Sequence, residues 1–438
     1  MFPQEISIIL LQILFIYIFF RFPIISENSK ILKNFSSNFT RLDLIGLNII
    51  VFLNVFIIFS ILSININFFF FSYLGLIFIV FLIDRNYQNK IKYNNNEFLI
   101  LFIILILSID LANKLILGWD VQNFWYFKAL NLFQEKNFGN LNILPLAGYP
   151  HLGPYIWGFF WKFPFGNFEY LGRISYIFLY TCAIFSFSEV LKIKNLARLI
   201  FSLLVILASY KYELFNGDPD ILIFIFLLFA AKLTFYLNNI KMKKNQLFLM
   251  LQLLGIANIL YWTKMEGIFF VIFLIISILI YNNFIHKKIK IKILCVLFFI
   301  IIFKPIYFEL FNIIQYEKNL FQFSDTIDFK FVDFLDRSFK IFFYLSVYMI
   351  ENSLYVISVL LFIFMKKNAL KSQLNKTIYS FSIMSLIFIY VAFFFKSIEV
   401  ELQLRQALPQ MIFGLSSFYL LFISGYINQY SADKNNLY

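Results

Sequence analysis

Charged and aromatic side chains stand together in this sequence where a long apolar run has just ended. The clearest stretch is LGWDVQNFWYFKAL, from Leu117 to Leu130, which carries Asp120 and Lys128. A carboxylate at such a place can act as a general base, which takes the proton from a hydroxyl group as that oxygen attacks. The opposing interpretation is that Asp120 caps the helix that it begins, with its carboxylate accepting backbone N–H groups.

Further polar groups occur after or between other apolar runs. They are His151 in GYPHLGPYIWGFFW (148–161), Arg173 at the start of a run, Asp218 in NGDPD (216–220), Lys264 and Glu266 in YWTKMEG (261–267), and Arg405 in VELQLRQALPQ (400–410). An arginine near Lys264 and Arg173 would bind phosphate oxygens with two parallel hydrogen bonds, which is the role expected of Arg405.

Each of these residues also has a purely structural interpretation. His151 would be a solvated loop residue, and Arg173 would extend to the lipid headgroups. Asp218 would be the N-cap of a helix whose first position is Pro219. Lys264 and Glu266 would pair only with each other and close a hairpin.

The composition is that of a protein that crosses a membrane many times. Of 438 residues, 61% are hydrophobic and only 14% are charged, which is far below the charged fraction of a soluble domain. Apolar runs of about 20 residues can each cross the hydrocarbon layer as a helix. We predict an all-α polytopic integral membrane protein with about thirteen spans, at 6–25, 44–62, 66–83, 98–117, 171–190, 196–210, 220–237, 246–261, 267–282, 293–311, 341–364, 377–395 and 410–427.

The basic residues predict the orientation. Most of the 37 Lys and Arg residues fall in the connections 21–43, 84–97, 191–198, 238–245, 283–292 and 365–376. Because Lys and Arg are hard to translocate, these connections belong in the cytoplasm, which puts the N-terminus outside and the C-terminus inside. The net charge of +13 is therefore a topology signal, and its scatter over short loops excludes a nucleic-acid partner. Most acidic residues fall on the outer side, where we expect any chemistry.

The outer connection 118–170 is the longest and holds four of the five tryptophans. Its residues 121–135 predict an amphipathic helix along the membrane surface, and a second interfacial helix begins near Tyr155. The runs beside YWTKMEG are short, about 24 Å as helices, so Lys264 and Glu266 would lie below the headgroups. Ionisable groups at that depth are costly unless they line a water-filled cavity or bind a ligand. The D-x-D spelling of 218–220 is set aside as a nucleotide-sugar motif, because those sugars are cytoplasmic substrates.

The same stretches carry a resemblance to a known superfamily. In order, they are WDVQNFWYFKA (119–129), YPHLGPYIW (149–157), GDPDILIF (217–224), TKMEGIFF (263–270) and RQALP (405–409). They resemble the bacterial membrane glycosyltransferases of the GT-C superfamily, which is related to the dolichyl-phosphate-mannose protein mannosyltransferases. The resemblance implies a helical fold with interfacial helices in a large outer loop. The chain would comprise a three-helix membrane extension (1–97), the transferase module (98–427) and a short cytoplasmic tail (428–438).

Roles for the site residues follow from the resemblance. Asp120 matches the catalytic position, Lys264 and Glu266 the T-K-x-E-G element, and Arg405 the late arginine before proline. As the base, Asp120 would activate an acceptor hydroxyl, while Lys264 and Arg405, with Arg173, stabilise the departing lipid phosphate. Such a direct displacement predicts inversion at the anomeric carbon. Secondary candidates for orienting donor or acceptor are Asp218, Glu266, Lys128 and His151.

The implied donor is a sugar on a polyprenyl-phosphate carrier, and the acceptor is a lipid, glycan or protein of the cell envelope. The implied place is the extracytoplasmic face of the bacterial inner membrane, among membrane lipids. No cofactor is expected, and a divalent cation is disfavoured because Asp120 is followed by Val121 rather than by a second carboxylate.

Two alternatives stay open. A flippase or transporter for a lipid-linked saccharide could use the same outward cavity without chemistry, although matched broken helices are not evident. A polysaccharide polymerase or ligase is the other, although its large outer loop more often comes late in the chain.

Overall fold

The protein is built from helices. The computed structural model describes residues 3–21, 40–83, 95–136, 138–144, 147–148, 151–191, 193–210, 214–239, 243–282, 285–313, 331–364, 372–395 and 400–435. Within these ranges there is no strand. The all-helical class predicted from the apolar runs is therefore confirmed.

Every predicted span falls on a helix or, in one case, on two. The long elements are α1 (Pro3–Arg21), α3 (Arg41–Ile61), α4 (Ile66–Ile83), α6 (Asn95–Lys114), α9 (Tyr170–Ser188), α10 (Asn195–Ser209), α11 (Asp220–Asn239), α12 (Lys243–Thr263), α13 (Met265–Tyr281), α14 (Lys287–Leu310), α15 (Phe331–Glu351), α16 (Ser353–Ile363), α18 (Gln373–Phe394) and α19 (Val400–Asn435). The loop between α6 and α9 holds a π-helical turn η1 (Val121–Trp125), α7 (Tyr126–Phe133), a 3-10 segment η2 (Phe138–Ile143) and α8 (Leu152–Lys162).

Eight of the described helices are long and apolar enough to cross a membrane, and a bent pair would make a ninth. These helices mark the chain as a membrane protein. Three further apolar helices, α4, α10 and α13, are shorter. A total of thirteen spans stays a prediction.

The span predicted at 341–364 is broken. In its place α15 and α16 meet at Asn352 with a bend of 91°. Asn352 has extended backbone angles, and its side-chain oxygen accepts the N–H of Tyr355 at 3.0 Å, which caps the start of α16. A side chain that satisfies a backbone group in this way favours a helix terminus over a continuous helix.

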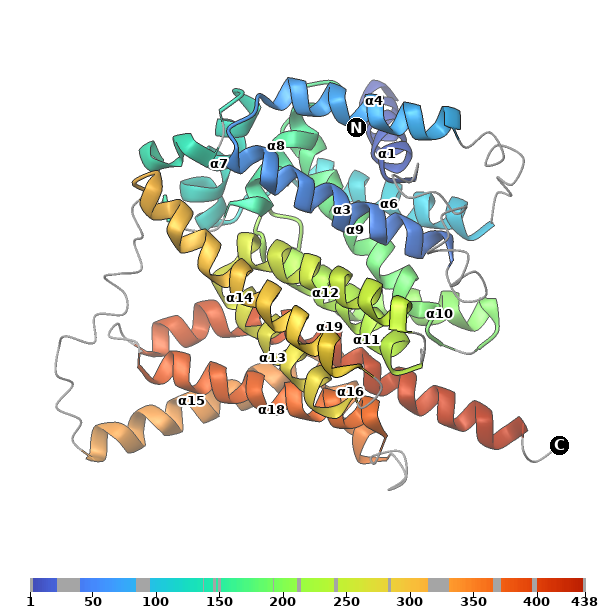
Figure 1. Cartoon of the computed structure of the whole chain (residues 1–438), viewed down its shortest axis with the longest axis vertical. Helices are drawn as coiled ribbons and strands as arrows, with labels where there is room; N and C mark the ends of the chain where they lie inside the picture. Colours follow the sequence, from blue (N-terminus) through green and yellow to red (C-terminus); the bar gives the residue numbers. More distant parts are fainter. Residues whose placement is uncertain are drawn as a thin grey trace.

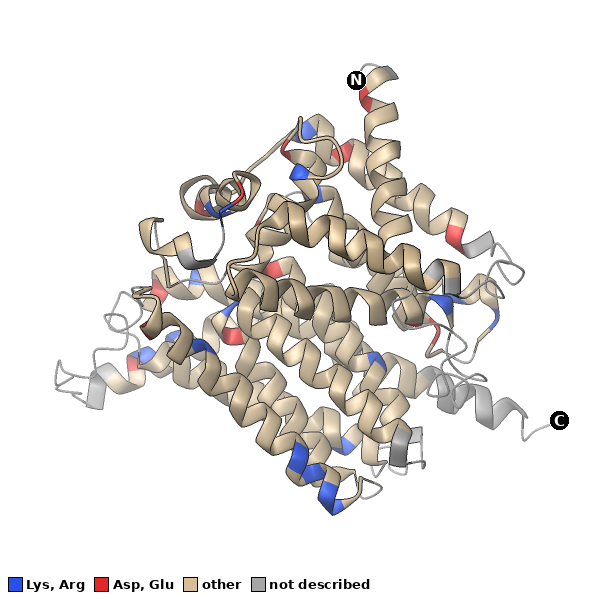
Figure 2. Cartoon of the chain, turned by 45° about the horizontal axis from the view of Figure 1, so that its top comes forward, with Lys and Arg blue, Asp and Glu red and all other residues tan. Residues whose placement is uncertain are grey.

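The helix bundle has two ends, which we name by what they carry. The site end holds α7 and α8 together, beside the ends of several long helices (Figure 1). Phe308, near the C-terminus of α14, contacts His151 beside α8, so α14 ends at the site end. The opposite end of the bundle therefore holds Lys287 and the other lysines that begin α14, and we name it the basic end. Figure 2 shows that charged residues gather toward the helix ends and are few along the middles.

The loop between α6 and α9 contains two helices, as predicted, but only the first lies at the surface. Gln122 and Asn123 are exposed while Val121 and Trp125 are buried, as the amphipathic pattern predicts, but Asn131 of the predicted polar face is buried. In contrast, α8 is buried along its whole length from Leu152 to Trp161, against α7, α9 and α12. The expectation that α8 lies along the lipid surface is therefore wrong.

The three N-terminal helices share the core of the helices that follow. α1 packs against α6 and α9, and α3 packs against α9 and α12. Their buried side chains belong to the same continuous hydrophobic cluster as those of α11 and α19. A domain boundary at residue 97 stays a prediction.

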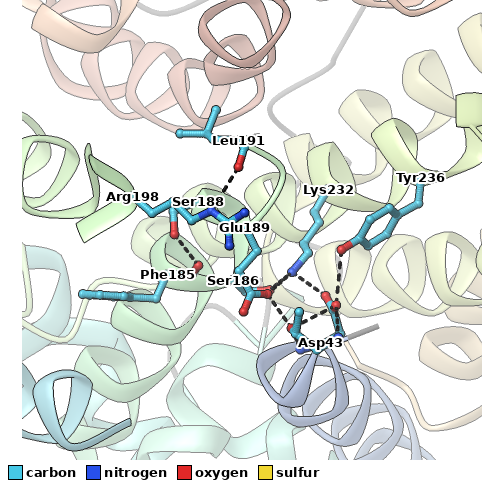
Figure 3. Close-up of polar contacts among 10 residues, drawn as sticks. Asp43, Phe185, Ser186, Ser188, Glu189, Leu191, Arg198, Lys232 and Tyr236 are labelled. Atoms are coloured by element: carbon cyan, nitrogen blue, oxygen red, sulfur yellow. Dashed lines mark hydrogen bonds and ion pairs between the residues drawn. The ribbon is translucent and has the colours of Figure 1, made fainter. Parts of the chain in front are cut away.

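Buried charges join three helices at the basic end (Figure 3). Lys232 on α11 contacts Asp43 in the first turn of α3, and its Nζ lies 2.8 Å from Glu189 Oε2 at the end of α9. Thr40 caps α3 together with Asp43, and its hydroxyl also contacts Glu189. Removing one partner of a buried ion pair typically costs about 3–5 kcal/mol. This cluster therefore fixes how α3, α9 and α11 align, at the end opposite to α7 and α8.

We expect the site end to face outward and the basic end to face the cytoplasm. In a chain whose exposed Cys295 is replaced by serine, a cysteine at Asn123 should react with an impermeant thiol reagent in intact cells, once any outer membrane is permeabilised. A cysteine at Lys287 should react only after lysis. Cys182 is buried and can remain. The reverse labelling pattern would contradict the orientation.

Candidate functional site

A cavity of about 180 Å³ opens at the site end, between the start of α11 and the stretch of α19 from Pro409 to Phe413. It is lined by Leu214, Asn216, Asp218, Asp220, Ile221, Pro409, Gln410 and Phe413. Below it, the rings of Phe224 and Phe413 stack with centroids 4.7 Å apart, which holds α11 against α19. The cavity thus combines carboxylate and amide groups with apolar walls, as small-molecule sites commonly do.

The segment before α11 is fixed by bonds from side chains to the backbone. Asn216 Oδ1 accepts the N–H of Asp218 at 2.9 Å, and Asp218 Oδ1 accepts that of Asp220 at 3.3 Å. α11 begins at Asp220, so Asp218 bonds to the first residue of the helix from two positions before it, and Pro219 stands just before the helix instead of at its first position. Between Asn216 and Asp218, Gly217 has a φ of +101°, a conformation that side chains beyond glycine rarely adopt. These local bonds hold both carboxylates at the cavity wall.

Lys264 lies in the single-residue turn between α12 and α13 and pairs with Asp220 rather than with Glu266. Its Nζ donates to Asp220 Oδ1 and, at 3.3 Å, to Gln410 Oε1. Gln410 Nε2 in turn donates to Asp218 Oδ2 at 3.3 Å. One chain of polar contacts therefore joins the α12–α13 turn, α11 and α19, and the predicted hairpin-closing pair is not formed.

Asp120 lies at the surface, directly before the π-helical turn. Its backbone is already helical, with φ −61° and ψ −33°, and its carboxylate makes no capping hydrogen bond. The interpretation of Asp120 as a helix cap is therefore wrong. A chemical role for Asp120 stays a prediction.

Two glycines bring the segment of Asp120 against the segment before α11. A Cβ added at Gly118 would lie 2.7 Å from Asn216 Nδ2, and one added at Gly217 would lie 2.7 Å from Val121 Cγ1. No larger residue fits at either place without a shift of its neighbour. The chain on both sides of Asp120 is therefore packed on the segment that carries the cavity carboxylates.

Electrostatics link Asp120 to the cavity. Partial withdrawal from water raises the pKa of Asp120, the positive charge of Lys264 lowers it, and the negative charge of Asp220 raises it again. Burial raises the pKa of Asp218 well above its ordinary range, and the charge of Asp220 adds to that rise. Burial alone would lower the pKa of Lys264, but the charges of Asp220 and its acidic neighbours outweigh burial and raise it. Lys264 therefore stays charged, and the Asp218 carboxyl holds its proton more firmly than an exposed aspartate.

Arg173 is fully buried and does not extend to the lipid headgroups. It bonds to the segment before Asp120 and to the segment before α11. Its Nη1 donates to the backbone oxygens of Ile116 at 2.8 Å and of Phe215 at 3.1 Å. Its Nε and Nη2 donate to Glu169 at 3.1 and 2.6 Å. Ile116 and Phe215 precede the two loops that meet at the site, so Arg173 positions them, and the headgroup interpretation is wrong.

Lys128 on α7 and His151 directly before α8 are both buried and do not line the cavity. The backbone N–H of His151 donates to Trp262 O at 3.1 Å, and its ring packs on Phe308. Burial lowers the pKa of His151, and the charges of Lys128 and Lys304 lower it further. His151 is thus an enclosed, neutral ring rather than the solvated loop residue of the alternative interpretation.

Arg405 lies on the expected helix but outside the cavity. Its side chain is 60% exposed, and its Nη2 donates to Glu401 at 2.6 Å and its Nε to Tyr344 at 3.1 Å. Gln410, more than one turn farther along α19, reaches the cavity instead. Arg405 pairs with Glu401, Lys264 with Asp220 and Arg173 with Glu169, so each of the three basic residues has an acidic partner of its own, and a shared phosphate stays a prediction.

Sequence reasoning missed Asp220 and Gln410. Asp220 was visible as the second aspartate of the D-x-D spelling, and its Oδ2 accepts no hydrogen bond within the described ranges. Gln410 carries no charge, and nothing in the sequence set it apart. Glu266 lies in the first turn of α13, where its charge raises the pKa of Lys264, but it does not line the cavity. In the described part of the chain, no three or more His, Cys, Asp or Glu residues are grouped so as to hold a metal ion.

We expect two neutral substitutions to shift the pKa of Asp120 in opposite directions. Lys264→Gln removes a positive neighbour, so the pKa should rise, whereas Asp220→Asn removes a negative one, so the pKa should fall. Infrared titration of the carboxyl band, with Asp120→Asn as the reference for subtraction, measures both shifts. Shifts of the same sign would contradict the arrangement around the cavity.

The sequence and the structure were compared with known proteins, and the comparison does not assign the site. The chain matches no family model, no curated protein and no solved structure. What the site can do therefore follows from its residues and their contacts.

Proposed function

We propose that this chain is a membrane glycosyltransferase. It moves a sugar from a polyprenyl-phosphate carrier to an acceptor hydroxyl on the extracytoplasmic face, with inversion, in the modification of a cell-envelope glycan or lipid. The observation that carries the proposal is a cavity lined by Asp218 and Asp220, with Lys264 paired to Asp220 beside it and the charges of both partners acting on Asp120. These groups come from three separate parts of the chain.

Asp120 is the base in this proposal. It takes the proton of the acceptor hydroxyl while that oxygen forms a bond to the anomeric carbon of the sugar. The bond from this carbon to the phosphate oxygen breaks, and its electron pair leaves with the polyprenyl phosphate. Because a single displacement occurs, the configuration at the anomeric carbon inverts. The raised pKa of Asp120 favours this role, because a stronger base accepts the proton more readily.

Lys264 stabilises the negative charge that develops on the departing phosphate. An ammonium group has three donors, and two of those of Lys264 are directed to Asp220 and Gln410. The third can bind a phosphate oxygen. Asp218 and Asp220 line the cavity, so their carboxyl groups would orient the sugar hydroxyls.

A second cavity supports a lipid carrier. An apolar groove of about 630 Å³ runs between α3, α12 and α14, and Trp262 on its wall stands two residues before Lys264. Along α3 the groove extends from Leu47 to Leu62, which is roughly 22 Å of helix. The groove is therefore long enough to hold an extended lipid chain.

The first prediction for this function concerns Asp120→Asn. Because the Asp120 carboxylate caps no helix, the substitution should leave folding unchanged, but an amide cannot accept the proton. We expect a loss of about 10² to 10⁴ in the transfer rate, with donor binding largely kept. Purified protein with radiolabelled polyprenyl-phosphate sugars measures the rate as the label that leaves the lipid.

Asp336→Asn is the matched control, because Asp336 is an exposed aspartate that pairs with Lys340 on α15. It should transfer sugar at the parent rate. Asp120→Glu should recover little activity, since the added methylene displaces the carboxylate by about an ångström. A near-parent rate for Asp120→Asn would remove Asp120 from catalysis.

The second prediction separates Lys264 from Arg405. Lys264→Gln removes a charged donor at the cavity, so affinity for the lipid donor should fall roughly tenfold or more. Arg405→Gln should change that affinity little, because the guanidinium is exposed and bonded to Glu401. Equilibrium binding of labelled polyprenyl phosphate compares the two. A larger loss in Arg405→Gln would show that phosphate binds at α19 instead of beside α12.

A further inference from the structure

The C-terminus of α12 is held by groups from three parts of the chain. A helix leaves its last four backbone carbonyls without partners inside the helix. Three of them in α12 have partners: Leu260 O accepts the N–H of Lys264 at 2.9 Å, Trp262 O that of His151 at 3.1 Å, and Tyr261 O accepts Lys304 Nζ at 2.8 Å. Of these partners only Lys304 is a side chain, and it comes from α14.

Lys304 is enclosed to an unusual degree for a lysine, with 1% of its surface exposed. Its Nζ lies 4.5 Å from the ring centroid of Tyr261 and 5.4 Å from those of Trp262 and Phe308. An ammonium group is costly to bury unless other groups compensate for lost water. Here the negative end of the α12 dipole and the faces of three aromatic rings do so.

The turn that follows α12 is as short as it can be. Lys264 alone separates the end of α12 from the start of α13. A Cβ added at Gly267 would lie 2.7 Å from Leu260 O, so the two helices are already as close as glycine permits. Where α12 ends therefore decides where the Lys264 side chain begins. A displacement of this terminus would draw Lys264 away from Asp220.

We propose that Lys304 is a positioning residue of the candidate site. It fixes the C-terminus of α12 and thereby holds Lys264 against Asp220 and near Asp120. The proposal rests on the site that the proposed function uses, but its test reads the electrostatics of Asp120 and needs no transfer reaction. Its failure can therefore be told apart from a failure of the proposed function.

The chain offers a matched control on the same helix. Lys290, at the start of α14, donates to Leu279 O near the C-terminus of α13, at the basic end. Lys290→Met thus removes the same kind of contact, from a lysine of α14 to a helix C-terminus, far from the site. Lys304→Met removes it beside the site.

The experiment is a double-mutant cycle read as the pKa of Asp120 by infrared titration. We expect Lys304→Met to raise this pKa, as Lys264→Gln does, because the lysine charge moves away. Since Lys304 acts through Lys264, the double variant should show the shift of Lys264→Gln alone. Additive shifts would mean that Lys304 acts by its own charge, and they would overturn the proposal. An unchanged pKa in Lys304→Met, or an equal shift in Lys290→Met, would overturn it too.

A milder variant covers the case in which Lys304→Met does not fold, as judged by its melting temperature and by size-exclusion chromatography. Phe308→Leu removes one of the three rings against the ammonium group and leaves Lys304 in place. It should raise the Asp120 pKa by a smaller amount, again only while Lys264 is present. An Asp120 pKa that stays at the parent value in this variant overturns the proposal as well.

Discussion

The ion pair between Lys264 and Asp220 joins two turns whose positions apolar packing alone would not fix. Apolar contacts are not directional, and lipid tails are as apolar as the leucines and phenylalanines of these helices. A charged pair is directional and expensive to leave unpaired. Lys232 does the same for three helices at the basic end (Figure 3), so a buried lysine ion pair joins separate elements at each end of the bundle.

The helices could be predicted because the membrane removes most alternatives. Backbone groups in hydrocarbon must bond within their own segment, so an apolar run of sufficient length is a helix almost by necessity. The break at Asn352 was missed because the apolar pattern continues on both sides of it, and only the side-chain cap distinguishes this asparagine. The enclosure of α8 was missed because a buried aromatic helix and an interfacial one have the same composition, and only tertiary contacts separate them.

The candidate site was predicted in part, for reasons that differ between residues. Lys264 was predicted from its depth below the headgroups, because an ionisable group at that depth needs a partner. The partner is Asp220 and not Glu266. Asp220 was set aside on an argument about substrates, which says nothing of where a side chain lies. Arg405 illustrates the limit of spacing, because a residue on the correct helix can still face Glu401 and water.

The contacts of Gly118 and Gly217 carry a consequence for how such a protein can change. Each glycine accommodates a side chain of the opposite loop, so the Asp120 segment and the segment before α11 are shaped to one another. A larger residue at either glycine fits only if the facing side chain of the other segment becomes smaller or moves. Exchange of one loop alone with a distant homologue would create a clash, whereas exchange of both together preserves the fit. The two loops should therefore be inherited, and engineered, as one module.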